Sequence, residues 1–362
     1  RDLTAGDNRL SEEEKGTYHS LTNKNSVAYQ YLESLAKSGL THLHLLPLAD
    51  FGSVSENRSA WKQLPLTSSP SPYSAYPQEQ VGQIRSEDSY NWGYDPVHFM
   101  VPDGSYSMTP NSASRIFEFR KMVQSLNQIG LRLIMDVVFN HTYTSGDERF
   151  SVFDKIVPLY FYRLNSAGEL YKTSCCPDVA TENAMAEKLI IDSVIHWAKV
   201  YKVDGFRFDL MSMHTLAGMT RLKNSLRSLT LESDGVDGSK LYIYGEAWPF
   251  GSLEEKNPGQ SFQQVRSYQL GIGVFNDRMR DAIRGGTTSS VEKSDQGFAT
   301  GLYYHFNREP ANQNTPPDIE GQRQKLLHLG DVIKIGLAGN LKTYKIRDHF
   351  NQFVEGGDYR YR

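Results

Sequence analysis

Two apolar segments of the sequence contain charged residues that could do chemistry on a bound ligand. Residues 203–210 are mostly apolar but carry Arg207 and Asp209 two positions apart. Alternate residues of a strand lie on one face, so Arg207 can pair with Asp209 and orient its carboxylate. Such a pair is costly to bury unless its members serve each other or a ligand. Residues 241–246 form a second apolar segment, which ends in Glu246.

A third segment, residues 131–139, contains Asp136 and continues into Asn140 and His141. An isolated arginine–aspartate pair would be explained more readily as a structural ion pair. Three successive buried strands that end in polar residues favour an active site instead, because a (β/α) barrel collects its catalytic groups at the carboxyl ends of its strands.

Helical and strand patterns alternate along the chain, which predicts an α/β fold. We predict a (β/α)8 TIM barrel, truncated after about six βα units. Long loops over about 49–110 and 140–183 would follow its second and third strands. No change of composition marks a boundary, so we predict one partial catalytic domain over residues 1–362. The expected helices are 26–37, 112–129, 184–201, 215–229, 278–283 and 322–337, and the expected strands are 40–48, 131–139, 203–209, 241–246 and 271–276.

The composition is that of a globular protein, with 39% hydrophobic and 22% charged residues and a net charge of −3. This charge gives no reason to expect a nucleic acid or an anionic membrane as a partner. No apolar run is long enough for a membrane segment. The aromatic content of 12% is compatible with a cleft that stacks on sugars, although a tyrosine-rich core gives the same figure. Because the chain starts at Arg1 without a methionine, we expect a processed product or a fragment.

The only two cysteines, Cys175 and Cys176, are neighbours. A bridge between them would close a small strained ring and could not join distant elements. They offer no spacing that predicts a metal site.

Several motifs resemble those of one enzyme family. Residues 136–141 (DVVFNH), 204–209 (DGFRFD) and 244–248 (YGEAW) resemble, in order, the first three signature regions of the α-amylase superfamily, glycoside hydrolase family 13. Residues 90–96 (YNWGYDP) resemble the motif that marks type I pullulanases and limit dextrinases. Segments 175–178 and 336–341 are also similar to pullulanase segments, especially those of secreted Gram-negative enzymes. The likeness extends over nearly the whole chain.

The resemblance implies roles for individual residues. Asp209 would be the nucleophile and Glu246 the general acid/base of a retaining double displacement, which needs two carboxyl groups about 5 Å apart. Tyr94 would stack under the sugar at the subsite that is cleaved. His141 and Asp136 would contribute to the sugar site and its support, although a purely structural Asp136 is equally compatible with the sequence.

Further residues would shape the site. The resemblance implies that Arg207 keeps Asp209 ionised. It also implies that Asn91, Trp92 and Asp95 shape a loop that favours a branched substrate. Trp92 and Trp248 could each stack on a sugar or pack within a loop. His42 and His44 are more readily explained as structural histidines than as ligands.

The implied activity is hydrolysis of α-1,6-glucosidic linkages in pullulan, amylopectin or limit dextrins. The alternatives are an α-1,4-acting amylase or neopullulanase, and a catalytically inactive barrel that binds glucan. The resemblance implies no required cofactor, although a structural Ca²⁺ is compatible with it. The expected partner is an α-glucan, with no nucleic acid and no membrane segment. We expect a secreted or cell-surface location for a bacterial protein and a plastid location for a plant or algal one.

The chain departs from the family pattern in three places. Ala247 and Ser212 stand where glycine is common. The His-Asp pair of the fourth signature region, whose aspartate supports the transition state, does not follow Glu246; Asp348 and His349 occur in the reverse order. A barrel short of two strands leaves two long apolar edges open, so we expect residues 1–362 alone to be poorly soluble or oligomeric. Without the third carboxylate, we expect them to have little hydrolytic activity.

Overall fold

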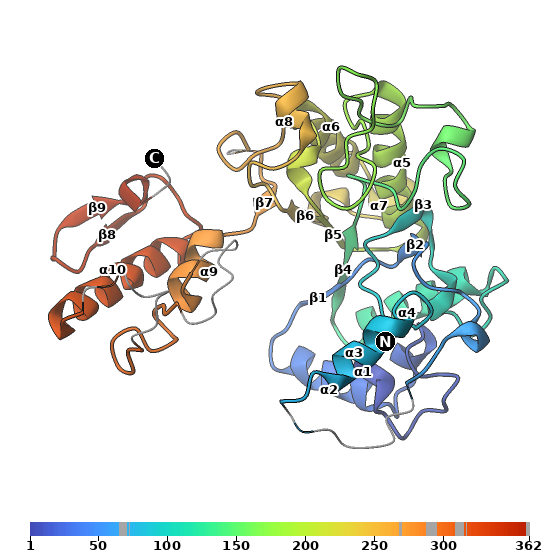
Figure 1. Ribbon diagram of the computed structural model, residues 1–362, viewed down its shortest axis with the longest axis horizontal. Coiled ribbons are helices and arrows are strands. Elements are labelled where there is room, and N and C mark those ends of the chain that lie inside the picture. Colours follow the sequence, from blue (N-terminus) through green and yellow to red (C-terminus); the bar gives the residue numbers. More distant parts are fainter. Residues whose placement is uncertain are drawn as a thin grey trace. The chain divides into compact units, whose positions relative to one another are not determined.

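A computed structural model describes residues 1–64, 71, 73–267, 270–286, 295–307, 315 and 317–359. The chain packs as two compact units, Arg1–Val274 and Phe275–Arg362 (Figure 1). The single catalytic domain predicted over residues 1–362 stays a prediction.

The larger unit is built around a parallel sheet. Its strands are β1 (His42–Leu45), β4 (Arg132–Val137), β5 (Gly205–Phe208), β6 (Tyr242–Gly245) and β7 (Gly273–Val274). Their order in the sheet is their order in the chain, and every neighbouring pair is parallel. This confirms the predicted α/β fold, with five parallel strands in the described residues where about six were expected.

The sheet is strongly curved. The Tyr244 hydroxyl of β6 lies 2.9 Å from Nδ1 of His44 on β1, although β4 and β5 separate these strands in the sheet. A flat sheet would hold strands three places apart at about 14 Å, because each neighbouring pair is about 4.8 Å apart. The inner faces of β1 and β6 therefore approach each other, as they do in a barrel.

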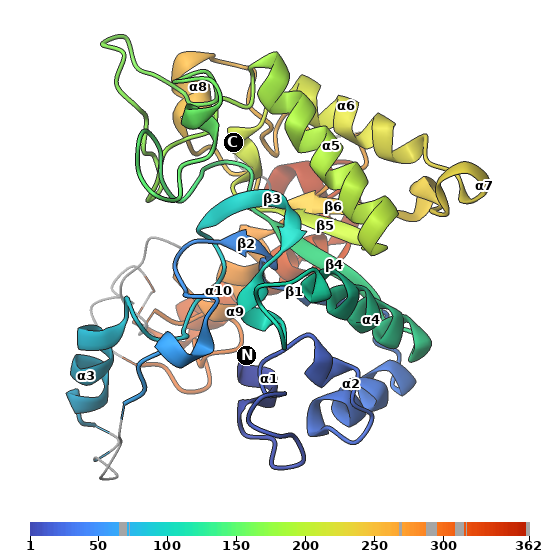
Figure 2. The same cartoon turned by 90° about the vertical axis from the view of Figure 1, so that its right-hand side faces the viewer.

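Four main helices of this unit confirm the predicted ones to within two residues at each end. They are α2 (Val27–Lys37), α4 (Ser114–Gln128), α5 (Ala184–Tyr201) and α6 (Leu216–Arg227). Local capping sets two of their starts: Ser26 Oγ accepts the N–H of Tyr29, and Thr215 Oγ1 accepts that of Gly218. Helices α4, α5 and α6 run along the outer side of the strands (Figure 2).

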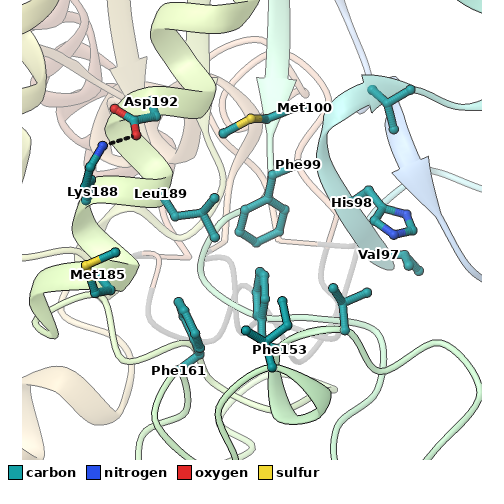
Figure 3. Close-up of a pocket in the computed structure, with 13 residues that line it drawn as sticks. Val97, His98, Phe99, Met100, Phe153, Phe161, Met185, Lys188, Leu189 and Asp192 are labelled. Atoms are coloured by element: carbon teal, nitrogen blue, oxygen red, sulfur yellow. Dashed lines mark hydrogen bonds and ion pairs between the residues drawn. The ribbon is translucent and has the colours of Figure 1, made fainter.

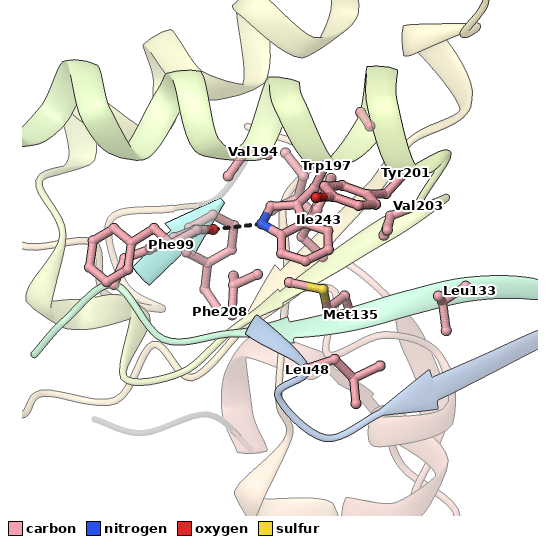
Figure 4. Close-up of a cluster of buried hydrophobic side chains, with 14 of the residues drawn as sticks. Leu48, Phe99, Leu133, Met135, Val194, Trp197, Tyr201, Val203, Phe208 and Ile243 are labelled. Carbon is pink, nitrogen blue, oxygen red and sulfur yellow. Dashed lines mark hydrogen bonds between the residues drawn. The ribbon is translucent and has the colours of Figure 1, made fainter. Parts of the chain in front are cut away.

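The main core fills the layer between sheet and helices. Val194, Trp197 and Tyr201 of α5 are buried in one cluster with Met135 and Phe208 of the strands (Figure 4). Because successive strand residues alternate between faces, the neighbours of these strand residues point to the other side of the sheet. Burial of the apolar strand residues against the helices thus orients the polar residues of the same strands toward the inner face of the sheet.

The segment 49–110, predicted as a loop, contains regular structure. Strands β2 (Ala49–Phe51) and β3 (Pro96–Pro102) pair antiparallel, and α3 covers Tyr76–Ile84, with single turns η2 (Arg58–Ala60) and η3 (Gly104–Tyr106). The prolines at both ends of β3 and the shortness of β2 obscured this pair in the sequence. Residues 65–70 and 72 of the predicted loop lie outside the described residues.

The second long excursion, 140–183, is held by polar contacts and isolated bridges. Its one described helical element is the turn η4 (Phe153–Lys155). His141 bridges to Asp178, and Tyr162 to Val179. The fully buried Arg163 donates to the partly exposed Glu182, and this ion pair helps to fix the excursion.

Short elements complete the larger unit: α1 (Asp2–Ala5), η1 (His19–Leu21), η5 (Met211–Met213), α7 (Leu231–Asp234), η6 (Gly238–Lys240) and α8 (Ser252–Lys256).

The smaller unit contains α9 (Asp277–Arg284), α10 (Ile319–Leu337), a hairpin of β8 (Lys345–Arg347) and β9 (Phe353–Glu355), and the turn η8 (Gly356–Tyr359). Residues 287–294, 308–314 and 316, between α9 and α10, lie outside the described residues. In the described parts of the chain, no helix combines the length and apolar character needed to cross a bilayer.

Candidate active site

One guanidinium group contacts three carboxylates at the carboxyl ends of β4, β5 and β6. Arg207 Nη1 lies 2.8 Å from Oδ1 of Asp136 and 3.0 Å from Oδ1 of Asp209. Its Nη2 lies 2.6 Å from Oε1 of Glu246. The sheet register explains the arrangement, since Asp136 on β4 stands beside Arg207 on β5. Asp209 and Glu246 follow the last residues of their strands.

Burial and charge together shift the pKa values of this cluster. Burial raises the pKa of Asp209, Arg207 opposes this shift, and Asp136 adds to it. Burial likewise raises the pKa of Glu246; Arg207 opposes the shift and Asp209 adds to it. Arg207 thus acts in the predicted direction, but it does not outweigh the desolvation of Asp209. A raised pKa suits a general acid, which must hold its proton near neutral pH.

The main chain also connects Asp209 to Glu246. Leu210, which follows Asp209, has a left-handed backbone with φ 38° and ψ 52°, a conformation that costs a leucine about 1–2 kcal/mol. In this conformation its N–H donates to Oε2 of Glu246 at 3.1 Å. Strain of this kind persists where surrounding contacts fix it, often at functional sites.

The loop 90–96 places a tyrosine beside the carboxylates. The Tyr94 hydroxyl donates to Oδ2 of Asp136 at 2.5 Å. The main-chain oxygen of Tyr94 accepts from Nε2 of His141 at 2.7 Å. Gly93 has φ 81°, and a Cβ there would lie only 2.5 Å from the Pro47 oxygen. Only glycine therefore lets the loop pass Pro47 and deliver Tyr94 to the site.

The structure brings together six of the predicted site residues: Tyr94, Asp136, His141, Arg207, Asp209 and Glu246. The other three lie on the same segments. Trp92 is 62% exposed, and its Nε1 donates to the Tyr90 hydroxyl at 2.8 Å. The main-chain oxygen of Asp95 accepts from the Gly52 N–H at 3.0 Å. Trp248 is half-buried, two residues beyond Glu246.

Two residues join the site without a predicted role. Asn140 Nδ2 donates to Oδ2 of Asp209 at 3.3 Å, and the same nitrogen donates to Nδ1 of His141 at 2.9 Å. Its place at the end of a predicted strand was the signal that could have identified it. His44 Nε2 lies 3.6 Å from Oδ2 of Asp136. The sequence carries no signal for this contact, because the curvature of the sheet creates it.

Cys175 and Cys176 are joined to each other by a disulfide. The Sγ atom of Cys175 lies 3.9 Å from Nε2 of His141, so the bridge borders the carboxylate cluster. While the disulfide is intact, neither sulfur is a thiolate that could hold a metal.

Among the residues that the structure describes, Asp50, Glu56 and Asp103 form a second group whose side chains approach closely enough to share a cation, besides His141 with the two cysteines. Arg115 already donates to both oxygens of Glu56, at 2.6 and 2.7 Å. Asp103 accepts main-chain N–H groups of Phe51 and Ser105. These existing partners account for the cluster, and the structural Ca²⁺ stays a prediction.

A separate groove of about 630 Å³ lies between β3, the first turns of α5 and residues 152–161 (Figure 3). Its lining is mainly apolar, including Phe99, Phe153, Phe161 and Leu189, with the Lys188–Asp192 ion pair at one side. None of the nine predicted site residues lines it. Its surface lacks the paired carboxylates that a hydrolytic site needs, so this groove is distinct from the candidate active site.

No family model matches the sequence. The chain is 41% identical to the chloroplastic pullulanase 1 of Arabidopsis thaliana over 361 residues, which cover 99% of this chain and 37% of that protein. The crystal structure of PulA from Klebsiella oxytoca superposes with a TM-score of 0.87 at 33% identity, over 100% of this chain and 36% of that one. A maltotriose complex of PulA from Klebsiella pneumoniae gives 0.84 at 34% identity, over 100% and 41% of the two chains.

The chain thus spans well under half the length of these relatives, and nearly all of it matches them in sequence and in fold. The chain belongs to the pullulanase family of glycoside hydrolases.

Proposed function

We propose that this chain carries the nucleophile and the general acid/base of a starch-debranching hydrolase. The reaction would be hydrolysis of α-1,6-glucosidic linkages in pullulan, amylopectin or limit dextrins. The observation that carries the proposal is the single guanidinium of Arg207, which contacts both Asp209 and Glu246. Two carboxylates held on one cation can face one glycosidic bond from neighbouring strands.

In the first step, Asp209 attacks the anomeric carbon while Glu246 gives its proton to the leaving oxygen, and a glycosyl ester forms on Asp209. In the second step, Glu246 removes a proton from water, which attacks the same carbon and releases Asp209. The anomeric configuration is retained after the two inversions. Arg207 and Asn140 orient the carboxylate of Asp209, and the Leu210 N–H orients that of Glu246.

The sugar would lie against Tyr94, whose ring face can pack on the apolar C–H groups of a pyranose. Asp136 and His141 would bond to its hydroxyl groups or support Tyr94, while Trp92 and Asp95 on the loop and Trp248 beyond β6 would shape the cleft. The maltotriose bound to a Klebsiella relative supports an α-glucan as the ligand. Two carboxylates perform this chemistry without a cofactor.

The cellular location can be inferred from the same similarity to pullulanases. A chloroplastic relative in a plant supports a plastid location if the protein is from a plant or alga. A bacterial protein would be secreted or held at the cell surface.

The test is to measure hydrolysis of pullulan and of amylose by the protein that carries this chain, with the configuration of the new reducing end followed by NMR. We expect pullulan to be cut to maltotriose with retention, and amylose to stay nearly intact. Asp209→Asn and Glu246→Gln should each lower kcat by at least about 10³-fold. Asp192→Asn, on the exposed side of α5, is the matched control.

Faster cleavage of amylose than of pullulan would replace the debranching assignment with an amylase. Tight maltotriose binding without any turnover, unchanged in Asp209→Asn, would replace it with a glucan-binding barrel.

A further inference from the structure

A small pocket of about 180 Å³ lies at the amino-terminal end of β6, at the opposite edge of the sheet from Asp209 and Glu246. Three parts of the larger unit line it: the last turns of α6, the turn η6 with the start of β6, and Gly271. The lining is mainly polar, in contrast to the groove beside β3. It therefore suits a small charged ligand rather than an apolar one.

Two cations from α6 converge at this pocket. Lys223 and Arg227 are one helical turn apart, where like charges destabilise a helix. A Cβ placed on Gly271 would lie 2.6 Å from Nζ of Lys223 and 3.9 Å from Nη2 of Arg227. Both charged groups therefore reach toward the same point, which the missing side chain of Gly271 leaves open.

These cations lack compensating charge within the part of the chain that the structure describes. No carboxylate there forms an ion pair with Lys223 or Arg227. Asp237, beside the pocket-lining turn η6, instead pairs with Lys240 at 3.1 Å and accepts from Ser239. Burial lowers the pKa of Lys223, and the charge of Arg227 lowers it further. The pocket thus holds two unneutralised positive charges at close quarters.

We infer that this pocket binds a phosphate dianion, either free or as a phosphomonoester of a sugar. The Arg227 guanidinium offers a planar pair of N–H donors that matches two phosphate oxygens, and the Lys223 ammonium supplies a second, compact charge. A bound dianion attracts both Lys223 and Arg227, and these two attractions offset the repulsion between the two cations. The inference does not depend on the proposed hydrolytic function, because none of its residues lies in the carboxylate cluster.

The experiment is thermal unfolding and calorimetric titration of the protein that carries this chain, with inorganic phosphate and, in a second arm, with glucose 1-phosphate. Chloride at matched ionic strength reports the general effect of salt. We expect phosphate to raise Tm by a few degrees in a saturable manner, with a Kd on the order of 1 mM. Tighter binding of glucose 1-phosphate would identify the sugar ester as the preferred source of the phosphate.

Lys223→Met and Arg227→Met should each weaken phosphate binding by about tenfold or more, whereas Lys24→Met, which removes the same charge from an exposed position elsewhere, should not. Without ligand, Lys223→Met should unfold at the same or a slightly higher temperature, because it relieves the repulsion. An equal rise of Tm in the Lys223→Met/Arg227→Met double variant, or an equal effect of chloride, would overturn the inference.

Discussion

The main-chain N–H of Leu210 donates to Oε2 of Glu246 at 3.1 Å. Because Leu210 directly follows Asp209, this bond joins the two proposed catalytic positions through the backbone as well as through Arg207. The side chain of Glu246 is therefore held at both oxygens, one by a cation and one by an amide. A carboxyl separation of about 5–6 Å, as a retaining mechanism requires, stays our prediction.

Replacement of Arg207 by leucine should lower kcat by at least about 10²-fold, with only a modest change in maltotriose affinity. The change leaves Asp136, Asp209 and Glu246 without their shared cation, so the pKa of Asp209 should rise further and less of the nucleophile should be ionised. Steady-state kinetics on pullulan measure the effect. Arg221→Leu, which removes an exposed ion pair with Glu187, is the control. A near-normal kcat in Arg207→Leu would show that Arg207 is only structural.

The pH dependence of kcat/KM should be bell-shaped and displaced to high pH. Activity falls with decreasing pH as Asp209 becomes protonated, and with increasing pH as Glu246 loses its proton. Since the pKa values of both groups are raised, both limbs should lie above those of ordinary carboxyl groups. Glu246→Gln should abolish the high-pH limb of this profile. The variant should retain a larger share of its activity on maltotriosyl fluoride than on pullulan, because fluoride needs no proton to leave. An unchanged upper limb would assign the acid to another residue.

The Tyr94 ring and hydroxyl should have separable effects. Tyr94→Phe keeps the ring but removes the hydrogen bond to Asp136, and should lower kcat by about tenfold with maltotriose affinity nearly unchanged. Tyr94→Ala should also weaken maltotriose binding, because the stacking surface is lost. Calorimetric binding and kinetics distinguish the two variants. Equal binding by both would contradict a stacking role.

Gly93→Ala should destabilise the fold by about 2–4 kcal/mol, because the new Cβ meets the Pro47 oxygen at 2.5 Å on a left-handed backbone. Gly130→Ala is the control: its φ is also positive, at 89°, but no atom lies within 4 Å of the new Cβ, so it should cost only about 1 kcal/mol. Urea unfolding measures both. Similar losses in the two variants would mean that the backbone angle alone matters.

Buried His214 should make the protein sensitive to acid. Burial lowers its pKa to about 3, below the ordinary value of about 6.5 that it has in the unfolded chain. The stability that it contributes is complete above pH 6.5 and is lost as pH falls toward 3, by on the order of 3 kcal/mol at pH 4.5. His214→Leu should flatten the fall in unfolding free energy between pH 6.5 and 4.5, whereas replacement of the exposed His305 should not. An unaltered slope would assign the acid sensitivity to other groups.

The sequence by itself determined the main helices and the parallel strands of the larger unit, and it singled out most of the residues of the candidate site. The periodicity of α5 gave its bounds without error, because the buried face of this helix is apolar except for Ser193, and Asn183 and Lys202 flank it. Alternation on β5 placed Arg207 and Asp209 on one face, since the period of a strand is two residues. The motif that contains Tyr94 was readable because residues 90–96 (YNWGYDP) resemble the motif that marks type I pullulanases.

The tertiary structure decided what depends on contacts between distant segments. The β2–β3 pair was hidden in a predicted loop, because two short strands with prolines at their ends have little pattern of their own. His44 reaches Asp136 only because the sheet curls. The net pKa of Asp209 depends on how much burial outweighs Arg207, a balance of two opposing effects that only coordinates can give. Local patterns are set by neighbours in the chain, whereas these relationships arise from packing between residues tens of positions apart.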